Sequence, residues 1–320
     1  MATQIENNHI PVLLEPILEF VKIKAQENLT NKKTEAIKVF DGTFGGGSYT
    51  KSFLEKQYQV YSCDLDSSTN LIAANLKTEF GDNFNFEIAN FKDYVSQFSD
   101  NFFDVIVVDL GYSTNQLDSS NRGFSYALGK TAILDLRYNS YILKPCYQLI
   151  LETKGASELA KIIYQNSGEN LSFKLAKVLW EMYHNSQTPE KITVQEIVTI
   201  LEEAIPAKFF MKTKSILSRI WQALRIWTNQ EFEVLKQFLE NSVSKLAPNG
   251  ILCVVSFHSL EDKIVASFMR KNTKPIDEDI YGNRTYNYKL LTPKFITPDE
   301  VELKNNPRSR SGRLRVLQKI

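Results

Sequence analysis

Residues 39–50 read VFDGTFGGGSYT, and they predict a strand, a glycine-rich turn and the start of a helix. The apolar pair at the start continues a strand that Asp41 ends. Gly45, Gly46 and Gly47 then follow in the turn. Glycine lets the backbone approach a bound ligand closely, and such a turn lies at the carboxyl end of its strand. We therefore expect a ligand site here, at one edge of a sheet.

Short segments rich in Val, Ile, Phe and Tyr predict the rest of that sheet. The first four alternate with stretches long enough for helices, which is typical of right-handed βαβ units and a parallel sheet. The predicted strands cover residues 36–40, 59–63, 84–88, 103–108 and 251–257, and a last strand covers 314–317. The sequence therefore predicts an α/β fold.

The segment between the fourth and fifth of these strands reads almost wholly as helix, which favours an inserted helical domain. In it, Thr193 and Glu196 fit a capping box, and Pro206 ends the helix that follows. A second amphipathic helix is predicted around Leu175. We expect a core in residues 1–123, an inserted helical domain in 124–213, and the rest of the core with a basic tail in 214–320.

Composition limits the class of protein. The 320 residues are 43% hydrophobic, yet no apolar run approaches the roughly 20 residues that a membrane span needs. The N-terminus lacks the basic start and apolar block of a secretory signal, so we expect a cytoplasmic protein with no membrane partner. Cys63, Cys146 and Cys253 lie far apart, which predicts buried free thiols and neither disulfides nor a metal site.

The net charge of +1 conceals a basic C-terminal end. Residues 281–320 hold nine Lys and Arg against three Asp and Glu, which favours nucleic acid as a partner. The candidates for phosphate contact are Arg308, Arg310, Arg313 and Arg315. Because Arg313 and Arg315 alternate with apolar residues as in a strand, these two could instead cover a sheet edge and pair with carboxylates.

Two acids beside the turn indicate which ligand it holds. Asp41 would repel a pyrophosphate but suits a ligand with an ammonium and a sulfonium, such as S-adenosylmethionine. The NAD fingerprint would also need a glycine where Thr50 stands. Asp64 ends the second strand, where a carboxylate can accept both ribose hydroxyls of an adenosine. Asp66, two residues on, is predicted to be a helix cap.

Asp109 ends the fourth strand and leads into a loop with Tyr112 and Gln116. The exocyclic amine of cytosine or adenine has its lone pair delocalised into the ring, so an acceptor for its N–H bonds helps that pair attack a methyl group. Asp109 is the candidate for this role, with Tyr112 as a stacking partner for the base. Asp109 could instead cap a helix or hold the loop. His258 is expected to be a hydrogen-bonded structural residue.

Several longer motifs occur in one order across nearly the whole chain. They are HIPVLLEPIL, DGTFGGGSYT, DLGYSTNQLD, RGFSY, LDLRYN, RIWQALRIWTNQEF, SFHSLEDKIV and NPRSRSGRLRV. In these motifs the chain strongly resembles the RsmH (MraW) family of bacterial methyltransferases. The resemblance implies a Rossmann-type core with a helical insertion, and methyl transfer from S-adenosylmethionine to N4 of a cytidine in the decoding region of 16S ribosomal RNA. The implied partner is that RNA or the small ribosomal subunit.

By position in these motifs, the family's cofactor contacts fall on the turn, on strand ends and on one loop residue. They are Gly47, Ser48, Tyr49, Asp64, Phe91, Asp109 and Gln116, to which the turn itself adds Asp41 and Gly45. The chain departs from the family's usual turn G-R-G-G-H-S at Gly46, Ser48 and Tyr49. It also carries Asn139 where the family usually has an acid.

Other functions stay open at this point. A ribosome-assembly factor without turnover could keep the fold and the RNA surface, and the altered turn fits it. The presence of Asp41, Asp64, Asp109 and Gln116 favours an enzyme instead. An amine methyltransferase that acts on DNA or on a protein glutamine is a further alternative. The basic tail disfavours a protein substrate but does not separate RNA from DNA.

Overall fold

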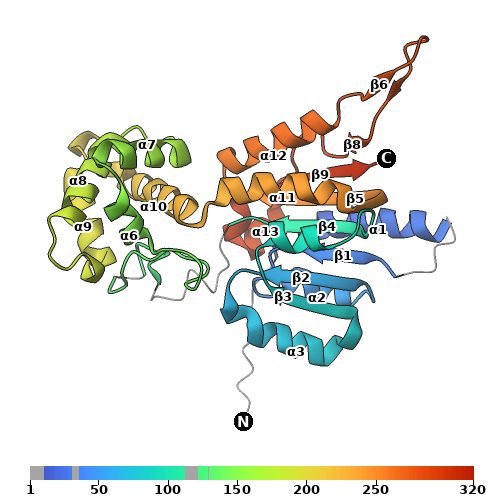
Figure 1. The fold of residues 1–320 in the computed structure, drawn as a ribbon, viewed down its shortest axis with the longest axis horizontal. Helices are drawn as coiled ribbons and strands as arrows, with labels where there is room; N and C mark the ends of the chain where they lie inside the picture. Colours follow the sequence, from blue (N-terminus) through green and yellow to red (C-terminus); the bar gives the residue numbers. More distant parts are fainter. Residues whose placement is uncertain (1–10, 31–35, 112–121, 129) are drawn as a thin grey trace. The chain divides into compact units, whose positions relative to one another are not determined.

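The computed structural model describes residues 11–30, 36–111, 122–128 and 130–320. The chain divides into two compact units (Figure 1). A sheet unit combines residues 1–111 with 233–320, and a helical unit comprises 112–232. The helical unit is longer at both ends than the expected insertion, 124–213, and at its C-terminal side the helix that begins at residue 213 packs into its core.

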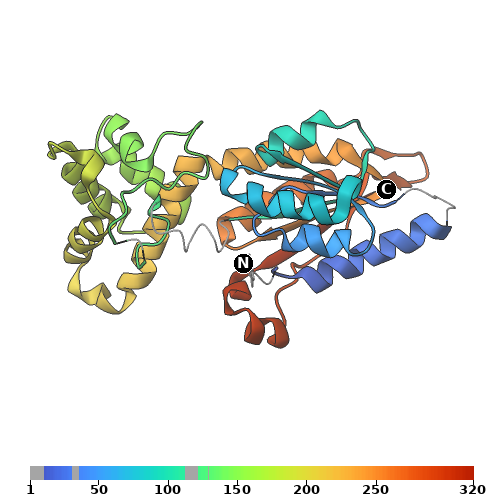
Figure 2. The same cartoon turned by 90° about the horizontal axis from the view of Figure 1, so that it is seen from below.

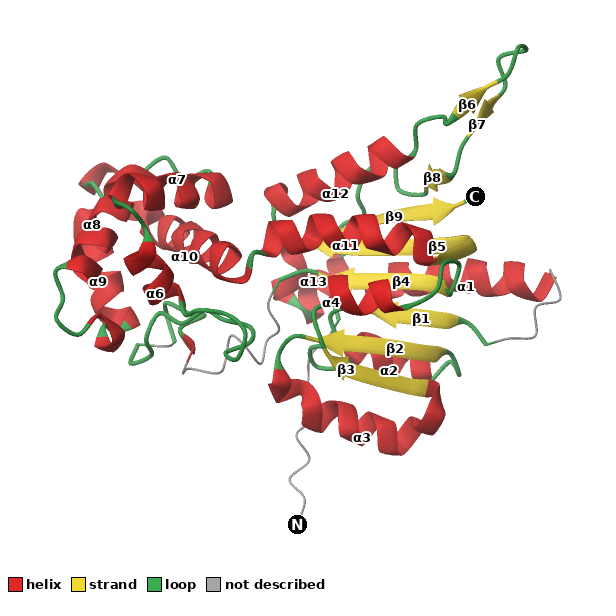
Figure 3. Cartoon of the chain, in the orientation of Figure 1, coloured by secondary structure: helices red, strands yellow, loops and turns green. Residues whose placement is uncertain are grey.

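The sheet unit is built on a seven-stranded sheet with the order β3-β2-β1-β4-β5-β9-β8 (Figure 3). Neighbours from β3 to β5 run parallel, whereas β9 and β8 are antiparallel to their neighbours, so the predicted α/β fold is confirmed. The strands are β1 (Lys38–Asp41), β2 (Gln59–Asp64), β3 (Phe84–Ile88), β4 (Phe103–Asp109), β5 (Leu246–Ser256), β8 (Tyr288–Leu290) and β9 (Arg313–Lys319), with a separate hairpin of β6 (Asp277–Glu278) and β7 (Arg284–Thr285).

Strand β5 begins at Leu246, before the predicted start at residue 251. Asn249 has left-handed backbone there, with φ 61°, and the register between β4 and β5 shifts beside Phe103. The helix α11 (Glu231–Lys245) has already ended. Pro248, Asn249 and Gly250, which are residue types typical of a turn, therefore mark an irregularity inside the strand. Alternation did not predict β6, β7 and β8, because each spans only two or three residues.

Helices cover both faces of the sheet (Figure 2). Along β4, Val105 and Val107 lie in one apolar core and Ile106 and Val108 in the other, as the alternation of a strand requires. The first core is completed by α1 (Leu14–Thr30), α2 (Ser48–Leu54) and α3 (Asn70–Phe80), and the second by α4 (Phe91–Tyr94), α11 and α12 (Ser259–Asn272). All three cysteines are buried and free, as predicted.

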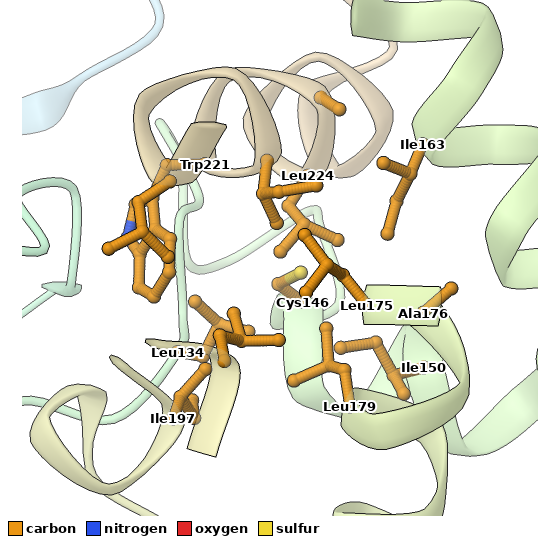
Figure 4. Close-up of a cluster of buried hydrophobic side chains, with 14 of the residues drawn as sticks. Leu134, Cys146, Ile150, Ile163, Leu175, Ala176, Leu179, Ile197, Trp221 and Leu224 are labelled. Carbon is orange, nitrogen blue, oxygen red and sulfur yellow. The ribbon is translucent and has the colours of Figure 1, made fainter. Parts of the chain in front are cut away.

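The helical unit has a core of its own, made where several amphipathic helices meet (Figure 4). The predicted capping box is confirmed: Thr193 accepts a hydrogen bond from the Glu196 N–H, and Glu196 accepts one from Thr193. The helices are α6 (Cys146–Glu152), α7 (Ala156–Ser167), α8 (Ser172–His184), α9 (Val194–Ala204) and α10 (Thr213–Asn229), with a 3-10 segment η6 (Ala207–Lys212) between the last two. Among the described residues, no helix is both long and apolar enough to cross a membrane.

Because each unit has a core of its own, a cavity in one unit should destabilise that unit alone. Replacement of Leu179, which is fully buried in the helical unit, by Ala should cost about 2 to 5 kcal/mol of that unit's stability. Hydrogen exchange should then show lost protection in α7 to α10, with protection kept in β1 to β4. The matched control, Leu252→Ala in the sheet, should give the reverse pattern. Equal loss of protection across the whole chain in both variants would show that the units unfold as one.

Candidate functional site

Three aspartates meet at one edge of the sheet. Asp41, Asp64 and Asp109 are the last residues of β1, β2 and β4, and these strands are neighbours that run parallel. The carboxyl ends of parallel strands share an edge, so the sheet brings together three acids that lie far apart in the sequence. This juxtaposition is the one that the sequence predicted.

The turn after β1 is packed closely against its neighbours. A Cβ on Gly42 would lie 2.8 Å from a Val108 methyl carbon and 3.0 Å from the Phe91 Cβ. Gly47 has φ 77°, in the left-handed region that glycine alone adopts readily, and it immediately precedes α2. The first turn of α2 therefore begins directly at the edge where the three acids lie.

Asp41 is committed to the turn. Its side chain accepts a hydrogen bond from the Thr43 N–H at 3.2 Å and another from the Thr50 hydroxyl at 2.7 Å. Only 1% of the residue is exposed, and burial raises the pKa of this carboxyl to about 6. Asp41 thus holds the turn in shape, and it contributes negative charge to the site through space.

Asp64 is half-buried and braces the same turn. One oxygen accepts a hydrogen bond from the Gly45 N–H at 2.7 Å, and the other accepts one from the Asp66 N–H at 2.8 Å. Burial raises the pKa of this carboxyl to about 6. Each oxygen has a second lone pair, so Asp64 can accept two further hydrogen bonds from a ligand. Asp66 caps a short 3-10 helix by accepting from the Ser68 N–H, as predicted.

Asp109 carries the least satisfied polar atom of the site. Its backbone N–H donates to the Thr43 hydroxyl at 2.7 Å, but its side-chain Oδ1 is buried with no hydrogen-bond partner in the described part of the chain. Burial raises the pKa of this carboxyl well above its usual range, and the charges of Asp41, Glu261 and Glu302 raise it further. Uncompensated negative charge in such surroundings is costly, so the site suits a positively charged ligand.

Tyr49 does not face this site with its hydroxyl. The hydroxyl donates a hydrogen bond to the Val12 carbonyl, and burial raises the pKa of the phenol well above its usual range. The next residue, Leu13, donates its N–H to a Glu302 carboxylate oxygen at 2.8 Å. The Tyr49 side chain therefore fastens the N-terminal segment to the turn. The adjacent Ser48, at the start of α2, is half-buried.

The remaining predicted contacts lie on elements beside the acids. Phe91 begins α4, and its ring packs edge-on against Phe238 with 4.9 Å between the ring centroids. It is half-exposed, so part of the ring is available to a ligand. Tyr112 and Gln116 lie outside the described residues.

His258 has the structural role expected of it. It caps α12, where its Nδ1 accepts from the Glu261 N–H at 3.4 Å, and Glu261 in turn accepts from the N–H groups of Phe257 and His258. The sequence did not predict that Glu261 would lie close enough to act on Asp109. Nor did it predict the role of Thr43, because its hydroxyl accepts from the Asp109 N–H, 66 residues later, and no local pattern indicates so distant a partner.

The basic tail splits into two pairs. Arg315 forms a bidentate ion pair with Asp262, with distances of 2.6 and 3.1 Å, and Arg313 reaches the same carboxylate at 3.4 Å. Both guanidinium groups also lie over the ring of Phe295. Arg308 and Arg310 are exposed on the 3-10 segment before β9. The geometry supports the alternative in which Arg313 and Arg315 pair with a carboxylate, although β9, which carries them, lies between β5 and β8 and is not the edge of the sheet.

Comparison with known proteins gives matches over nearly the whole chain. Residues 6–320 match the family described as the MraW methylase family. A protein of Rickettsia prowazekii is 34% identical over 98% of both chains, and one of Ehrlichia chaffeensis is 35% identical over 98% of this chain and 100% of its own. Both are named ribosomal RNA small subunit methyltransferase H. A methyltransferase structure from Streptococcus mutans, solved in complex with SAH, aligns over 98% of this chain and 100% of its own with a TM-score of 0.38 and 11% identity.

The cost of the buried Asp109 charge predicts a gain in stability when it is removed. A folded-state pKa above the unfolded value means that protonation stabilises the fold, so this contribution is lost as the pH rises from about 4 upward. Asp109→Asn should therefore raise the free energy of unfolding at about pH 8 by at least about 1 kcal/mol, and by much less at about pH 5. Thermal unfolding at the two pH values measures this difference.

Asp104→Asn on the same strand is the matched control. Asp104 lies 3.7 Å from the buried ammonium of Lys24, so its neutralisation leaves a buried cation and should destabilise the protein at both pH values. If Asp109→Asn also destabilised the protein at high pH, Asp109 would be a structural carboxylate with a partner in solution.

Proposed function

We propose, from the premise that this chain belongs to the MraW methylase family, that it methylates N4 of a cytidine in the decoding region of 16S ribosomal RNA. As in that family, the methyl donor is S-adenosylmethionine. The observation that carries the proposal is the unpartnered oxygen of Asp109 at the carboxyl edge of the sheet, beside a glycine turn and two further acids. The names of the curated relatives support the choice of small-subunit RNA as the substrate.

The residues at the sheet edge fit this methyl donor. S-Adenosylmethionine supplies a methyl group activated by a positively charged sulfonium, and it also carries an ammonium and an adenosine. The spare lone pairs of Asp64 would accept the two ribose hydroxyls, and the backbone of the turn from Gly45 to Gly47 would lie along the ligand, with Ser48 beside it. Phe91 would contact the adenine with its exposed part. The summed negative charge of Asp41 and Asp109 favours the cationic ligand and disfavours a dinucleotide.

Asp109 would orient the target amine. An N–H of the cytidine amine donated to Oδ1 holds the nitrogen in line with the methyl group and helps to localise its lone pair. The N–H acidity rises as the nitrogen gains the methyl group, so this hydrogen bond strengthens in the transition state, and the carboxylate of Asp109 would accept the proton that the amine loses. Tyr112 stays a proposed stacking partner for the base, and Gln116 a proposed cofactor contact.

The tail would contribute to RNA binding through its exposed pair. Arg308 and Arg310 are exposed and would contact phosphates, whereas Arg313 and Arg315, which pair with Asp262, would contribute only long-range positive potential. The proposed substrate is 16S ribosomal RNA, either free or within the small subunit.

Replacement of Asp64 should weaken cofactor binding. Asp64→Ala should lower the affinity for S-adenosylmethionine by about 1.5 to 3 kcal/mol, the scale of hydrogen bonds to a charged group. Isothermal calorimetry measures it. Asp66→Ala is the control, since Asp66 is a nearby acid whose side chain caps a helix through Ser68, and its affinity should stay within twofold of wild type. Unchanged affinity in Asp64→Ala would contradict the assignment of Asp64 to the ribose.

Product analysis tests the reaction itself. Mass spectrometry of digested small-subunit RNA should find N4-methylcytidine after incubation with the wild-type protein and S-adenosylmethionine. Asp109→Ala, which removes the acceptor, should lower the rate constant by about 100- to 1000-fold, the usual cost of a lost transition-state hydrogen bond, while the protein stays folded. A methylated adenosine, methylated DNA as the better substrate, or no turnover despite cofactor binding would each contradict the proposal.

A further inference from the structure

The segment that joins α9 to α10 in the helical unit has an unusual distribution of charge. Residues 204–230 contain five Lys and Arg and no acidic residue. Two of the five are neutralised by partners, since Arg219 pairs with Glu169 at 2.6 Å and Arg225 pairs with Glu231 at 2.8 Å. The three lysines are exposed and have no carboxylate within ion-pair distance in the described part of the chain. They are Lys208, Lys212 and Lys214.

Two large apolar side chains stand among these lysines. Phe210 is 76% exposed and Met211 is 93% exposed, although both lie in the ordered 3-10 segment η6. Isolated exposed apolar residues are common, but an adjacent pair this open, within a cluster of cations, indicates a contact surface. We call the five side chains of Lys208, Phe210, Met211, Lys212 and Lys214 the lysine–phenylalanine surface.

The lysine–phenylalanine surface is anchored to the core of the helical unit. Ile205 is buried and Phe209 packs against the core of the helical unit, so the segment is anchored on both sides of Lys208. The Tyr126 hydroxyl donates to the Lys214 carbonyl at 3.3 Å. In a 3-10 turn, successive side chains point about 120° apart, so an inward Phe209 directs Phe210 and Met211 outward. The pair is thus displayed by the fold.

We propose that the lysine–phenylalanine surface binds single-stranded RNA. The three lysines would contact phosphates, and Phe210 would stack on an unpaired base. The first-turn N–H groups of α10, a helix of 17 residues with no acid in its first turn, add positive potential at the same place. A protein partner fits less well, because three unpaired lysines would need matching acids. This inference rests on the proposed ribosomal RNA substrate and adds a second contact region to the tail.

Binding to protein-free 16S ribosomal RNA tests the lysines. The protein is loaded with S-adenosylhomocysteine, so binding is measured without turnover. Lys208→Gln/Lys212→Gln/Lys214→Gln should flatten the slope of log affinity against log salt by about 2 if all three lysines touch phosphate. The matched control replaces three exposed lysines of the same unit, Lys154, Lys161 and Lys174, and should change the slope little. Equal flattening in both triple variants would overturn the proposal, because only overall charge would then matter.

Phe210→Ala tests the stacking contact. It should lower RNA affinity by about tenfold at every salt concentration, with an unchanged slope, since a stacked base carries no counterion term. Phe173→Ala is the control, because Phe173 is 59% exposed on α8 of the same unit and carries no proposed role. Melting temperature and cofactor affinity should not change in either variant. Wild-type affinity in Phe210→Ala would overturn the stacking assignment.

The same assays separate this surface from the proposed reaction. A wild-type protein that binds the RNA through these residues but transfers no methyl group would support the RNA-binding surface and contradict the proposed function. Variants that bind free RNA like wild type yet lose affinity for assembled small subunits would show that the surface contacts a ribosomal protein, and so would overturn the proposal. A wild-type protein with no salt-dependent affinity for the RNA would overturn it as well.

Discussion

The desolvation of three carboxylates at the edge of the parallel sheet is the constraint on which the site depends. The strand order places Asp41, Asp64 and Asp109 at one edge, and burial there raises the pKa of each carboxyl. The protein offsets part of the cost with N–H and hydroxyl donors from the turn, which satisfy Asp41 and one lone pair on each Asp64 oxygen. Oδ1 of Asp109 receives no such donor from the described residues. A cationic ligand therefore completes an arrangement that the polypeptide leaves electrostatically incomplete.

Local signals explain what the sequence could predict. The sequence distinguishes the roles of Asp64 and Asp66, because strand ends and helix caps have short-range signatures. It predicts the Thr193 capping box for the same reason. The hydrogen bond of the Tyr49 hydroxyl could not be predicted, because its acceptor, the Val12 carbonyl, lies 37 residues away and no local pattern indicates it. For Arg315 the sequence leaves two possible partners, a phosphate or a carboxylate, because the choice depends on Asp262, which lies 53 residues earlier.

The limits of the helical unit illustrate the same point for packing. The periodicity of α10 predicts an apolar face, but it does not say which core that face joins. Ile220 and Leu224 pack in the same core as Leu175 and Leu179, so α10 belongs to the helical unit. Membership of a core is a property of tertiary contact, and sequence periodicity alone cannot assign it.

The hydrogen bonds of Tyr49 and Glu302 to the N-terminal segment affect the order in which the chain can fold during synthesis. Leu13 N–H finds its acceptor 289 residues later, and β4 finds its neighbour β5 only after the whole helical unit has been made. The helical unit is continuous in sequence and can acquire its core as it leaves the ribosome. The sheet, by contrast, stays incomplete until β9 has been made. A chain that ended before Glu302 would lack both the acceptor for the Leu13 N–H and the strand that pairs with β5.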